Sequence, residues 1–350
     1  MKIQRYIPLL LALFCVFASC KKEEESKDLK YLYGVVEFDM PPFVLQGDMV
    51  DIYPGGIYRD TETVSNVGYF WKDPVSGKND TIRREGETYV PHFVYTVPSD
   101  TCGTMTLYVY AFAKGYNNSS GYVDFSVVDP RMDGKGSITG LEPILDCPSF
   151  SETRGGKMMM FYYNEMNGRN WSVRNEHLLI EDDGEFIYGH PFADAPAMAD
   201  VFGVYYTESE ARDPRACPKG WHVATERDWV ELAKAENPDV KPLEDFEGVS
   251  GALMADAKFN GAHMWEFYRE VKITNKYKFC AIPTGYMVLA GKNATYNGAF
   301  QYSAFWSRNT EGGADEMCVR LINVRYPKIY FFVPEHDNSY GASIRCVEDN

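Results

Sequence analysis

The sequence predicts an exported chain with two unlike folded parts, an all-β sandwich followed by an α+β domain with few helices. Three observations lead to this fold class. A short apolar leader precedes Cys20, residues 31–129 form short alternating segments without a helical period, and residues 150–350 combine one clear helix with aromatic, glycine-rich segments. We therefore divide the chain into a signal peptide (1–19), a tether (20–30), a sandwich (31–129), a linker (130–149) and a second domain (150–350).

Residues 1–19 have the three parts of a secretion signal. Lys2 and Arg5 form a basic start, and the apolar run from Ile7 to Phe17 is too short to cross a bilayer core, which needs about 20 residues. Phe17-Ala18-Ser19-Cys20 resembles the lipobox of bacterial lipoproteins, although Phe17 replaces the usual Leu or Val. The resemblance implies cleavage before Cys20 and a diacylglycerol anchor on that cysteine. The alternative is a plain signal peptide in which Cys20 has no role.

A charge run follows the cysteine, and such a run near a terminus is usually a solvated leader. This one also resembles the signal that carries lipoproteins of the Bacteroidota to the outer face of the outer membrane, through Lys22, Glu23, Glu24 and Glu25. The resemblance implies a protein exposed on the cell surface, with the membrane as its partner through the lipid.

The composition makes nucleic acid an unexpected partner and leaves the cysteine pairing open. With 35 basic and 50 acidic residues the formal net charge is −15, which opposes contact with phosphates. The 25 tyrosines suit binding surfaces, since their rings have an apolar body and a polar tip. Once Cys15 and Cys20 are set aside, an oxidising compartment permits disulfides among Cys102, Cys147, Cys217, Cys280, Cys318 and Cys346.

The clearest predicted strand of the first domain is 104–114. Met105, Leu107, Val109 and Ala111 share one face, while the other carries Thr106, Tyr108, Tyr110 and Phe112, so both faces are apolar enough to lie between layers. Further strands are predicted at 35–39, 50–53, 67–71, 92–97 and 122–128. Roughly seven strands in about 100 residues are typical of an immunoglobulin-like sandwich. The segment 115–120 and the closing 127–129 also resemble, weakly, the immunoglobulin-like modules of Bacteroidota surface lipoproteins.

The segment 130–140 is glycine-rich and polar, so we expect a flexible domain boundary there. In the second domain, Asn167-Gly168 predicts a tight hairpin turn between strands at 158–165 and 169–173. Thr225 with Asp228 predicts the start of a helix that should stop at Asn237-Pro238. Strands and long loops are expected at 279–283, 299–306, 317–324, 329–333 and 343–347.

An ordered set of short motifs gives this second domain a specific resemblance. The set runs Trp171 and Asn175, then Gly203 to Tyr206, Cys217-Pro218-Lys219-Gly220-Trp221-His222, Asp228-Trp229, Pro283-Thr284-Gly285, Phe305-Trp306-Ser307, and Ser343-Ile344-Arg345-Cys346. It resembles the Fibrobacter succinogenes major paralogous domain from about residue 150 to the end of the sequence. That family is thought to share the C-type-lectin-like fold, so the resemblance implies this fold for the second domain.

The resemblance also implies a disulfide. In that fold the cysteine that starts the first helix bonds to one in the last strand, which would join Cys217 to Cys346. Cys280 and Cys318 lie in neighbouring predicted strands and replace residues that are usually not cysteine in the family, so a second bridge is expected between them.

Two cysteines then remain, Cys102 and Cys147. They could pair across the linker or stay as small buried hydrophobic residues, and we favour the second state.

The tryptophans of the second domain are candidates either for sugar binding or for the core. Trp221, Trp229, Trp265 and Trp306 could stack on sugars, but the first two are expected to fill the core beside the helix. Calcium-dependent lectins of the fold place Asn-Asp after a Trp, whereas Trp306 is followed by Ser307 and Arg308, which disfavours calcium.

Catalysis has less support. Glu226 and Asp228 lie in the first turn of a predicted helix, where they favour a capping role. The histidines have no metal-ligand spacing, and no nucleophile triad or phosphate loop is present. We therefore expect no metal, no cofactor and no enzyme activity.

The function expected from the sequence is a non-catalytic binding or adhesion module on the cell surface. In this hypothesis the sandwich is a stalk, and the second domain presents long loops to a glycan or protein ligand. The alternative is a structural or assembly component of a surface appendage or envelope complex, which an unpaired edge strand or a large exposed apolar patch would favour.

Overall fold

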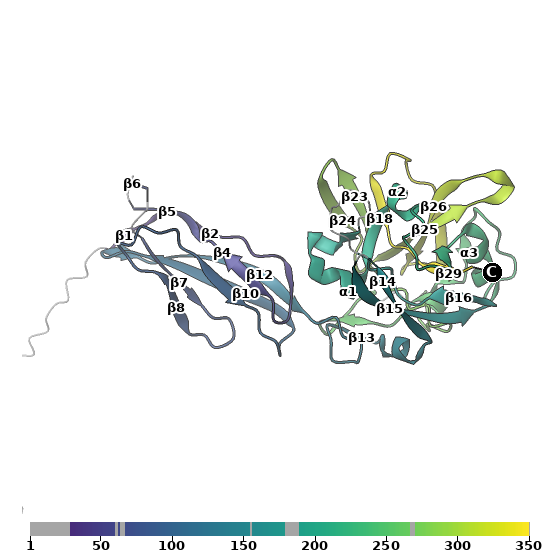
Figure 1. Ribbon diagram of the computed structural model, residues 1–350, viewed down its shortest axis with the longest axis horizontal. Coiled ribbons are helices and arrows are strands. Elements are labelled where there is room, and N and C mark those ends of the chain that lie inside the picture. Colours follow the sequence, from purple (N-terminus) through teal and green to yellow (C-terminus); the bar gives the residue numbers. More distant parts are fainter. Residues whose placement is uncertain are drawn as a thin grey trace, which may run out of the picture.

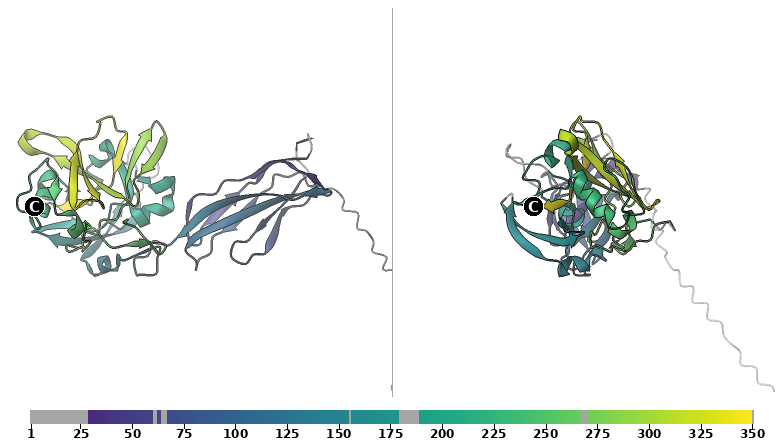
Figure 2. Two further views of the ribbon diagram at one scale, coloured as in Figure 1. Left: turned by 180° about the vertical axis from the view of Figure 1, so that it is seen from behind. Right: turned by 90° about the vertical axis from the view of Figure 1, so that its right-hand side faces the viewer.

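The computed structural model describes residues 29–349, with gaps at 60–61, 64–66, 155, 179–188 and 267–269. Cys20 and the segment Lys22 to Glu25 therefore lie outside the described residues. Of the described residues, strands make up 44% and helices 12%, which confirms a β-rich fold. Figure 1 shows two parts arranged end to end, and Figure 2 shows the same arrangement from behind.

The first part consists of two packed β layers. One layer is a five-stranded sheet in the order β3 (Phe43–Leu45), β12 (Ser119–Val128), β10 (Gly103–Phe112), β7 (Gly68–Lys72) and β8 (Asn79–Arg83). The other layer contains two small sheets, formed by β2 (Tyr33–Glu37), β5 (Gly55–Arg59) and β6 (Glu62–Thr63), and by β4 (Met49–Ile52) and β9 (Phe93–Thr96). A parallel pair, β1 (Lys30–Tyr31) and β11 (Tyr116–Asn117), lies where the described chain begins.

The core of this sandwich is formed by one face of the predicted strand 104–114. Leu107, Val109 and Ala111 on β10 are fully buried, and β2 approaches β12 so closely that a Cβ on Gly121 would lie 2.0 Å from the carbonyl oxygen of Val36. The other face of β10 is only partly covered. The expectation that both faces lie between layers is therefore wrong, because the second layer packs on one side only.

The second part surrounds its core with several small sheets. Their strand orders are β14 (Ser149–Arg154), β15 (Lys157–Met166), β16 (Arg169–Ser172), β29 (Cys346–Glu348), β19 (Trp221–Val223); then β20 (Phe246–Glu247), β27 (Lys328–Phe332), β26 (Glu316–Asn323), β25 (Tyr302–Asn309); then β17 (His190–Pro191), β18 (Val204–Thr207), β28 (Tyr340–Ala342), β23 (Tyr286–Ala290), β24 (Asn293–Asn297); and β13 (Ile138–Thr139), β21 (Lys258–Phe259), β22 (Ala262–His263).

Helices in this part are short. They are α1 (Ala199–Phe202), α2 (Glu208–Ala211), α3 (Glu226–Lys234) and α4 (Ser250–Leu253), with the 3-10 turns η1 (Glu142–Asp146), η2 (Phe192–Asp194), η3 (Pro196–Met198) and η4 (Glu311–Gly313). Thr225 and Asp228 form the predicted capping box of α3, which ends before Asn237-Pro238. The Asn167-Gly168 turn joins β15 to β16, and both residues have positive φ, as a tight hairpin turn requires.

The segment 130–149 is more ordered than the sequence suggests. Ser137 donates its backbone N–H to the carbonyl oxygen of Asp129 at 2.8 Å, and its hydroxyl accepts from the Asp129 backbone N–H at 2.9 Å. Ile138 and Ile144 are buried in the core of the second part. These apolar residues tie the segment to the second part, and a flexible boundary before Ser137 stays a prediction.

The two parts are in contact through an aromatic residue of β3. The Phe43 ring lies 5.8 Å from that of Phe192 and 6.4 Å from that of Phe259. Leu45 and Val128 from the sandwich join the same apolar cluster.

Candidate functional site

The tryptophans of the family-like motifs lie in the core of the second part. The Trp171 and Trp229 rings are 5.3 Å apart, and Trp229 also packs on Phe305 at 5.6 Å. Both expected core residues, Trp221 and Trp229, are buried, and so are Trp265 and Trp306. None of these four rings has the open face that sugar stacking needs.

Arg345 joins distant segments in this core. Its guanidinium donates to the carbonyl oxygens of Ser172 at 3.0 Å and Phe279 at 2.8 Å, and to Asn175 Oδ1 at 3.2 Å. Burial lowers the pKa of Arg345 to about 9. Asn175 in turn donates to the carbonyl oxygen of Phe202 at 2.9 Å, so this pair of motif residues has a structural role.

The remaining motif residues also shape the backbone and the core. Tyr206 donates to the Leu178 carbonyl at 3.1 Å and accepts at its own carbonyl from Trp306 Nε1 at 2.6 Å. Gly285 has φ of 80°, and a Cβ there would lie 2.2 Å from the Asn297 oxygen. Positive φ is also found at Gly203 and Gly220, while Pro218 and Pro283 are buried.

The predicted disulfide between Cys217 and Cys346 is confirmed. The predicted bridge between Cys280 and Cys318 is wrong, because the two thiols face different partners and are free. Cys280 has φ of 56° and its Sγ accepts from Asn275 Nδ2 at 3.1 Å, whereas Cys318 donates to the Ser307 carbonyl at 3.2 Å.

The two cysteines left over differ in exposure. Cys147 is buried, as favoured, but Cys102 is exposed. Cys102 lies in the loop just before β10, and the Gln46 Nε2 atom is 3.1 Å from its sulfur.

The two carboxylates at the start of α3 have different roles. Asp228 caps the helix as expected and accepts from His222 Nε2 at 3.0 Å. Glu226 is not a cap, because its carboxylate pairs with Arg320 in a site where both side chains are fully buried. Burial favours the neutral acid, but the hydrogen bonds and charge of Arg320 outweigh it and lower the pKa of Glu226.

The imidazole of His222 lies between two carboxylates. Its Nδ1 is 2.7 Å from Asp349 Oδ1, on the side opposite Asp228. The hydrogen bonds to Asp228 and Asp349 raise the pKa of His222.

Over the described residues, no group of three or more His, Cys, Asp or Glu side chains is arranged to hold a metal ion. In the same part of the chain, no helix has the length and apolar character needed to cross a membrane.

Exposed and half-buried aromatic rings gather instead on the outer side of the five-stranded sheet of the sandwich. We call this surface the aromatic face and define it as Phe70, Tyr108, Tyr110, Phe112 and Tyr122. Ring centroids are 4.8 Å apart for Phe70 and Tyr110, 6.3 Å for Tyr108 and Tyr110, and 5.7 Å for Tyr108 and Tyr122. Tyr122 is 64% exposed, so the stack continues into solvent.

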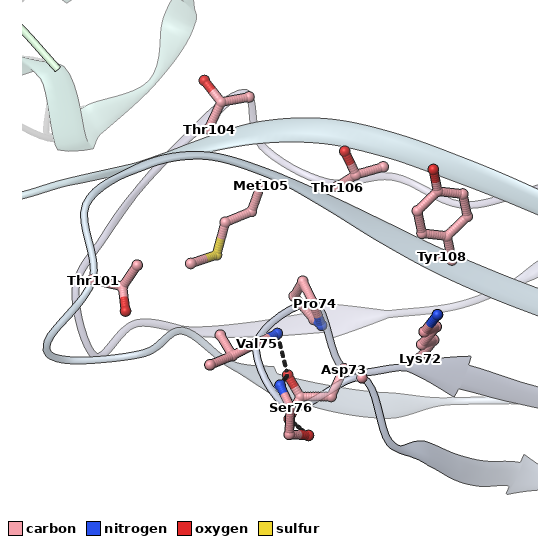
Figure 3. Close-up of a pocket in the computed structure, with 11 residues that line it drawn as sticks. Lys72, Asp73, Pro74, Val75, Ser76, Thr101, Thr104, Met105, Thr106 and Tyr108 are labelled. Carbon is pink, nitrogen blue, oxygen red and sulfur yellow. Dashed lines mark hydrogen bonds between the residues drawn. The ribbon is translucent and has the colours of Figure 1, made fainter. Parts of the chain in front are cut away.

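A groove of about 680 Å³ adjoins the aromatic face at Lys72 and Tyr108. Figure 3 shows Pro74 and Val75, from the turn between β7 and β8, on the side of β10 toward which Met105 points, while Thr106 and Tyr108 point to the other side of the strand. The lining therefore combines apolar atoms with an ammonium and hydroxyl groups, as ligand sites commonly do.

The walls of the groove are fixed by local hydrogen bonds. Asp73 accepts from the Val75 backbone N–H at 2.8 Å and from the Ser76 hydroxyl at 2.7 Å. Partial burial opposes ionisation of Asp73, but these hydrogen bonds outweigh it and lower the pKa of its carboxyl. Across the groove, Thr106 donates to Asp124 at 2.6 Å.

Sequence reasoning missed the aromatic face because it treated both sides of 104–114 as buried. The partner strand β12 contained the missing signal. Tyr108 pairs with Tyr122, Thr106 with Asp124, and Thr104 with Ser126, so the outward positions of both strands carry hydroxyl or carboxylate groups. Such alternation is typical of a solvated sheet face.

Comparison with known proteins identifies the second part. Residues 153–348 match the family model described as the Fibrobacter succinogenes major domain, and the match covers more than half of the chain. The chain belongs to this family. Every motif residue placed above, from Trp171 to Arg345, falls within the major domain, whereas the aromatic face and its groove lie outside it. Among curated proteins, none matches the sequence.

Solved structures give only distant likenesses. The superoxide reductase neelaredoxin of Ignicoccus hospitalis matches with a TM-score of 0.20 and 9% identity, over 27% of this chain and 82% of that one. A putative superoxide reductase of Thermotoga maritima matches with a TM-score of 0.20 and 14% identity, over 30% of this chain and 92% of that one. Likenesses this weak carry no argument about fold or activity.

Proposed function

We propose that this major domain protein is a lipid-anchored, non-catalytic binding module of the cell surface, and that its aromatic face holds a glycan. The observation that supports this role is the run of neighbouring rings that ends in the exposed Tyr108 and Tyr122, beside a groove with a mixed polar and apolar lining. The apolar faces of a sugar ring pack on aromatic carbon, while its hydroxyls need donors and acceptors such as Lys72 and Thr106. A glycan uses both kinds of surface at once.

The two parts then have the reverse of the roles expected from the sequence. The sandwich, for which we propose an immunoglobulin-like fold, binds the ligand rather than serving only as a stalk. The major domain, for which we propose a C-type-lectin-like fold, keeps Trp221, Trp229, Trp265 and Trp306 in its core. Cleavage before Cys20 would leave the sandwich next to the membrane anchor, followed by the major domain.

A binding role agrees better with the groove than catalysis does. The titratable side chains in its lining are Lys72, Asp73 and Tyr108, and both oxygens of Asp73 are engaged in the turn that it stabilises. Catalysis requires titratable groups that converge on a reacting atom, whereas the Ser76 hydroxyl and the Asp73 carboxylate of this lining are paired with each other within the turn.

The test is a glycan array probed with the soluble chain from Glu23 onward, in parallel with Tyr108→Ala and Tyr122→Ala. We expect selective binding that falls at least about fivefold in each variant, since stacking on an exposed ring typically contributes about 1 kcal/mol or more. Tyr326→Ala removes an equally exposed ring from the hairpin between β26 and β27 and should leave binding unchanged. Absence of binding to any glycan, or equal loss in all three variants, would refute the proposed site.

Assembly into a surface structure is the second candidate, because exposed apolar side chains also lie on the opposite layer of the sandwich, among them Tyr33 and Val35. This role requires the soluble chain to self-associate. Sedimentation velocity at increasing protein concentration separates the two functions, since a glycan-binding module is expected to remain monomeric.

A further inference from the structure

The layer of the sandwich that contains β2 and β5 carries a second group of exposed aromatic and apolar side chains. The group lies at the end where the described chain begins. Tyr31 is 76% exposed, Tyr33 59%, Val35 60% and Tyr58 47%. We call these four residues the tyrosine patch. Leu32 and Val36, which alternate with them along the chain, are buried. The alternation shows that the exposure belongs to one side of β1 and β2 and does not result from fraying.

Strand pairing brings the patch together. Tyr33 lies directly opposite Tyr58 in the antiparallel pair of β2 and β5. The reverse side of these strands packs Val36 and Ile57 against Val109 in the core. Because the aromatic face lies on the outer side of the other sheet, the patch and the aromatic face point in opposite directions.

The patch is also close to the proposed anchor. About 11 residues separate Cys20 from Tyr31, which limits their separation to about 40 Å even in a fully extended chain. Figure 1 shows β1, β2 and β5 in the part of the molecule remote from the major domain, with β1 at its outer end. An anchored sandwich therefore has this end nearest to the lipid.

We infer that the tyrosine patch rests in the headgroup region of the membrane beside the anchor. This inference rests on the proposed lipid anchor. Tyrosine favours such interfaces because its ring is apolar and its hydroxyl stays hydrated. Docking through this layer turns the aromatic face and its groove away from the membrane, where a glycan in the medium can reach them.

The experiment uses the chain from Cys20 with the substitution Cys102→Ser, coupled through the Cys20 thiol to a maleimide lipid in phosphatidylcholine vesicles. Cys102 is the exposed free thiol of the described residues, while Cys147, Cys280 and Cys318 are buried, so coupling is directed to Cys20. Tyr33→Trp adds a reporter in the patch. Tyr326→Trp adds one at an exposed position in the major domain.

With lipids brominated near the headgroup, we expect about a twofold or larger loss of the added emission for Tyr33→Trp and almost none for Tyr326→Trp, because bromine quenches only rings that reach the interface. The chain without an added tryptophan provides the background. Equal emission in brominated and ordinary vesicles for both variants would overturn the inference. Vesicle-free self-association that Tyr33→Ser abolishes would also overturn it, since the patch would then be a protein contact.

The chemical coupling separates this test from the proposed function. If mass spectrometry of the native N-terminus shows an unmodified Cys20, the anchor is refuted, and with it the setting of the patch. If the native cysteine is lipidated but Tyr33→Trp is not quenched, only the docking of the patch is refuted.

Discussion

Glu226 and Asp228 lie two residues apart, but burial separates their roles. Glu226 forms a fully buried pair with Arg320, and Ser307 donates to the same carboxylate at 2.7 Å. Glu226→Gln removes the charge while nearly keeping the shape, so Arg320 becomes an uncompensated buried cation. We expect the unfolding free energy to fall by about 3–5 kcal/mol.

Urea unfolding checks this value, with Glu231→Gln as the matched control in the same helix. Glu231 is half exposed and pairs with Lys234, so its loss should cost less than about 0.5 kcal/mol. A change below about 1 kcal/mol for Glu226→Gln would contradict the role assigned to the buried pair.

His222 makes stability depend on pH in a direction that its surroundings determine. Its pKa is raised above the ordinary 6.5, mainly by the hydrogen bond to Asp228. The stabilisation is therefore complete below the unfolded pKa and is lost as pH rises through the raised folded pKa. The unfolding free energy of the native chain should exceed that of His222→Gln at about pH 5.5, and the difference should shrink toward about pH 8.5.

At acid pH, the protonation of Asp228 limits the stabilisation that the His222–Asp228 pair provides. Burial opposes its ionisation, but the hydrogen bonds from His222 and Thr225 outweigh it and lower its pKa below the ordinary 3.8. Its contribution is present above that ordinary value and is lost as pH falls through the lowered one. If the difference in unfolding free energy between the native chain and His222→Gln grows from about pH 5.5 to about pH 8.5, the raised pKa of His222 is contradicted.

At the scale of elements, the two sides of β10 should respond differently to truncation. Leu107 is fully buried between the layers, so Leu107→Ala is expected to lower the unfolding free energy by about 2–5 kcal/mol. Tyr122→Ala, on the exposed side of the neighbouring β12, should change it by less than about 1 kcal/mol. Thermal unfolding followed by circular dichroism measures both, and equal losses would mean that both sides are covered.

The disulfide ties the segment before β19 to the last strand and closes a loop of 129 residues. Cross-links across loops of this length are estimated to stabilise by about 5 kcal/mol, less any strain. We expect the double variant Cys217→Ala, Cys346→Ala to lose about 2–5 kcal/mol in denaturant unfolding. The stability of this double variant should then be unaffected by a reductant, because Cys280 and Cys318 are free thiols, whereas a bridge between those two would make it sensitive.

At the scale of the whole molecule, Phe43 of the sandwich packs on the major domain, against Phe192 and Phe259. Phe43→Ser should weaken this contact without unfolding either part. Small-angle scattering is expected to show a broader range of overall dimensions, while the melting temperatures change little. Tyr110→Ser alters an aromatic residue of the same sandwich outside this contact, and an identical effect from it would contradict the role of Phe43.

Local patterns were sufficient for much of the fold. The alternation of 104–114, the Asn167-Gly168 turn and the Thr225 cap are each set by neighbouring residues and a fixed backbone period, so the corresponding elements are confirmed. The family-like motifs, from Trp171 to Arg345, also predicted the disulfide of Cys217 with Cys346. Those motifs did not locate a ligand site, because their side chains build the core.

Tertiary structure alone decided which surfaces are free. Both sides of β10 are apolar in sequence, and only the one-sided packing of the second layer leaves Tyr108 exposed. Glu226 resembles a helix cap until Arg320, distant in sequence, reaches it in the core. Periodicity is a property of near neighbours, whereas burial and charge pairing depend on residues that folding brings together, so the sequence determined the elements and their order while the packing determined which of their faces can bind.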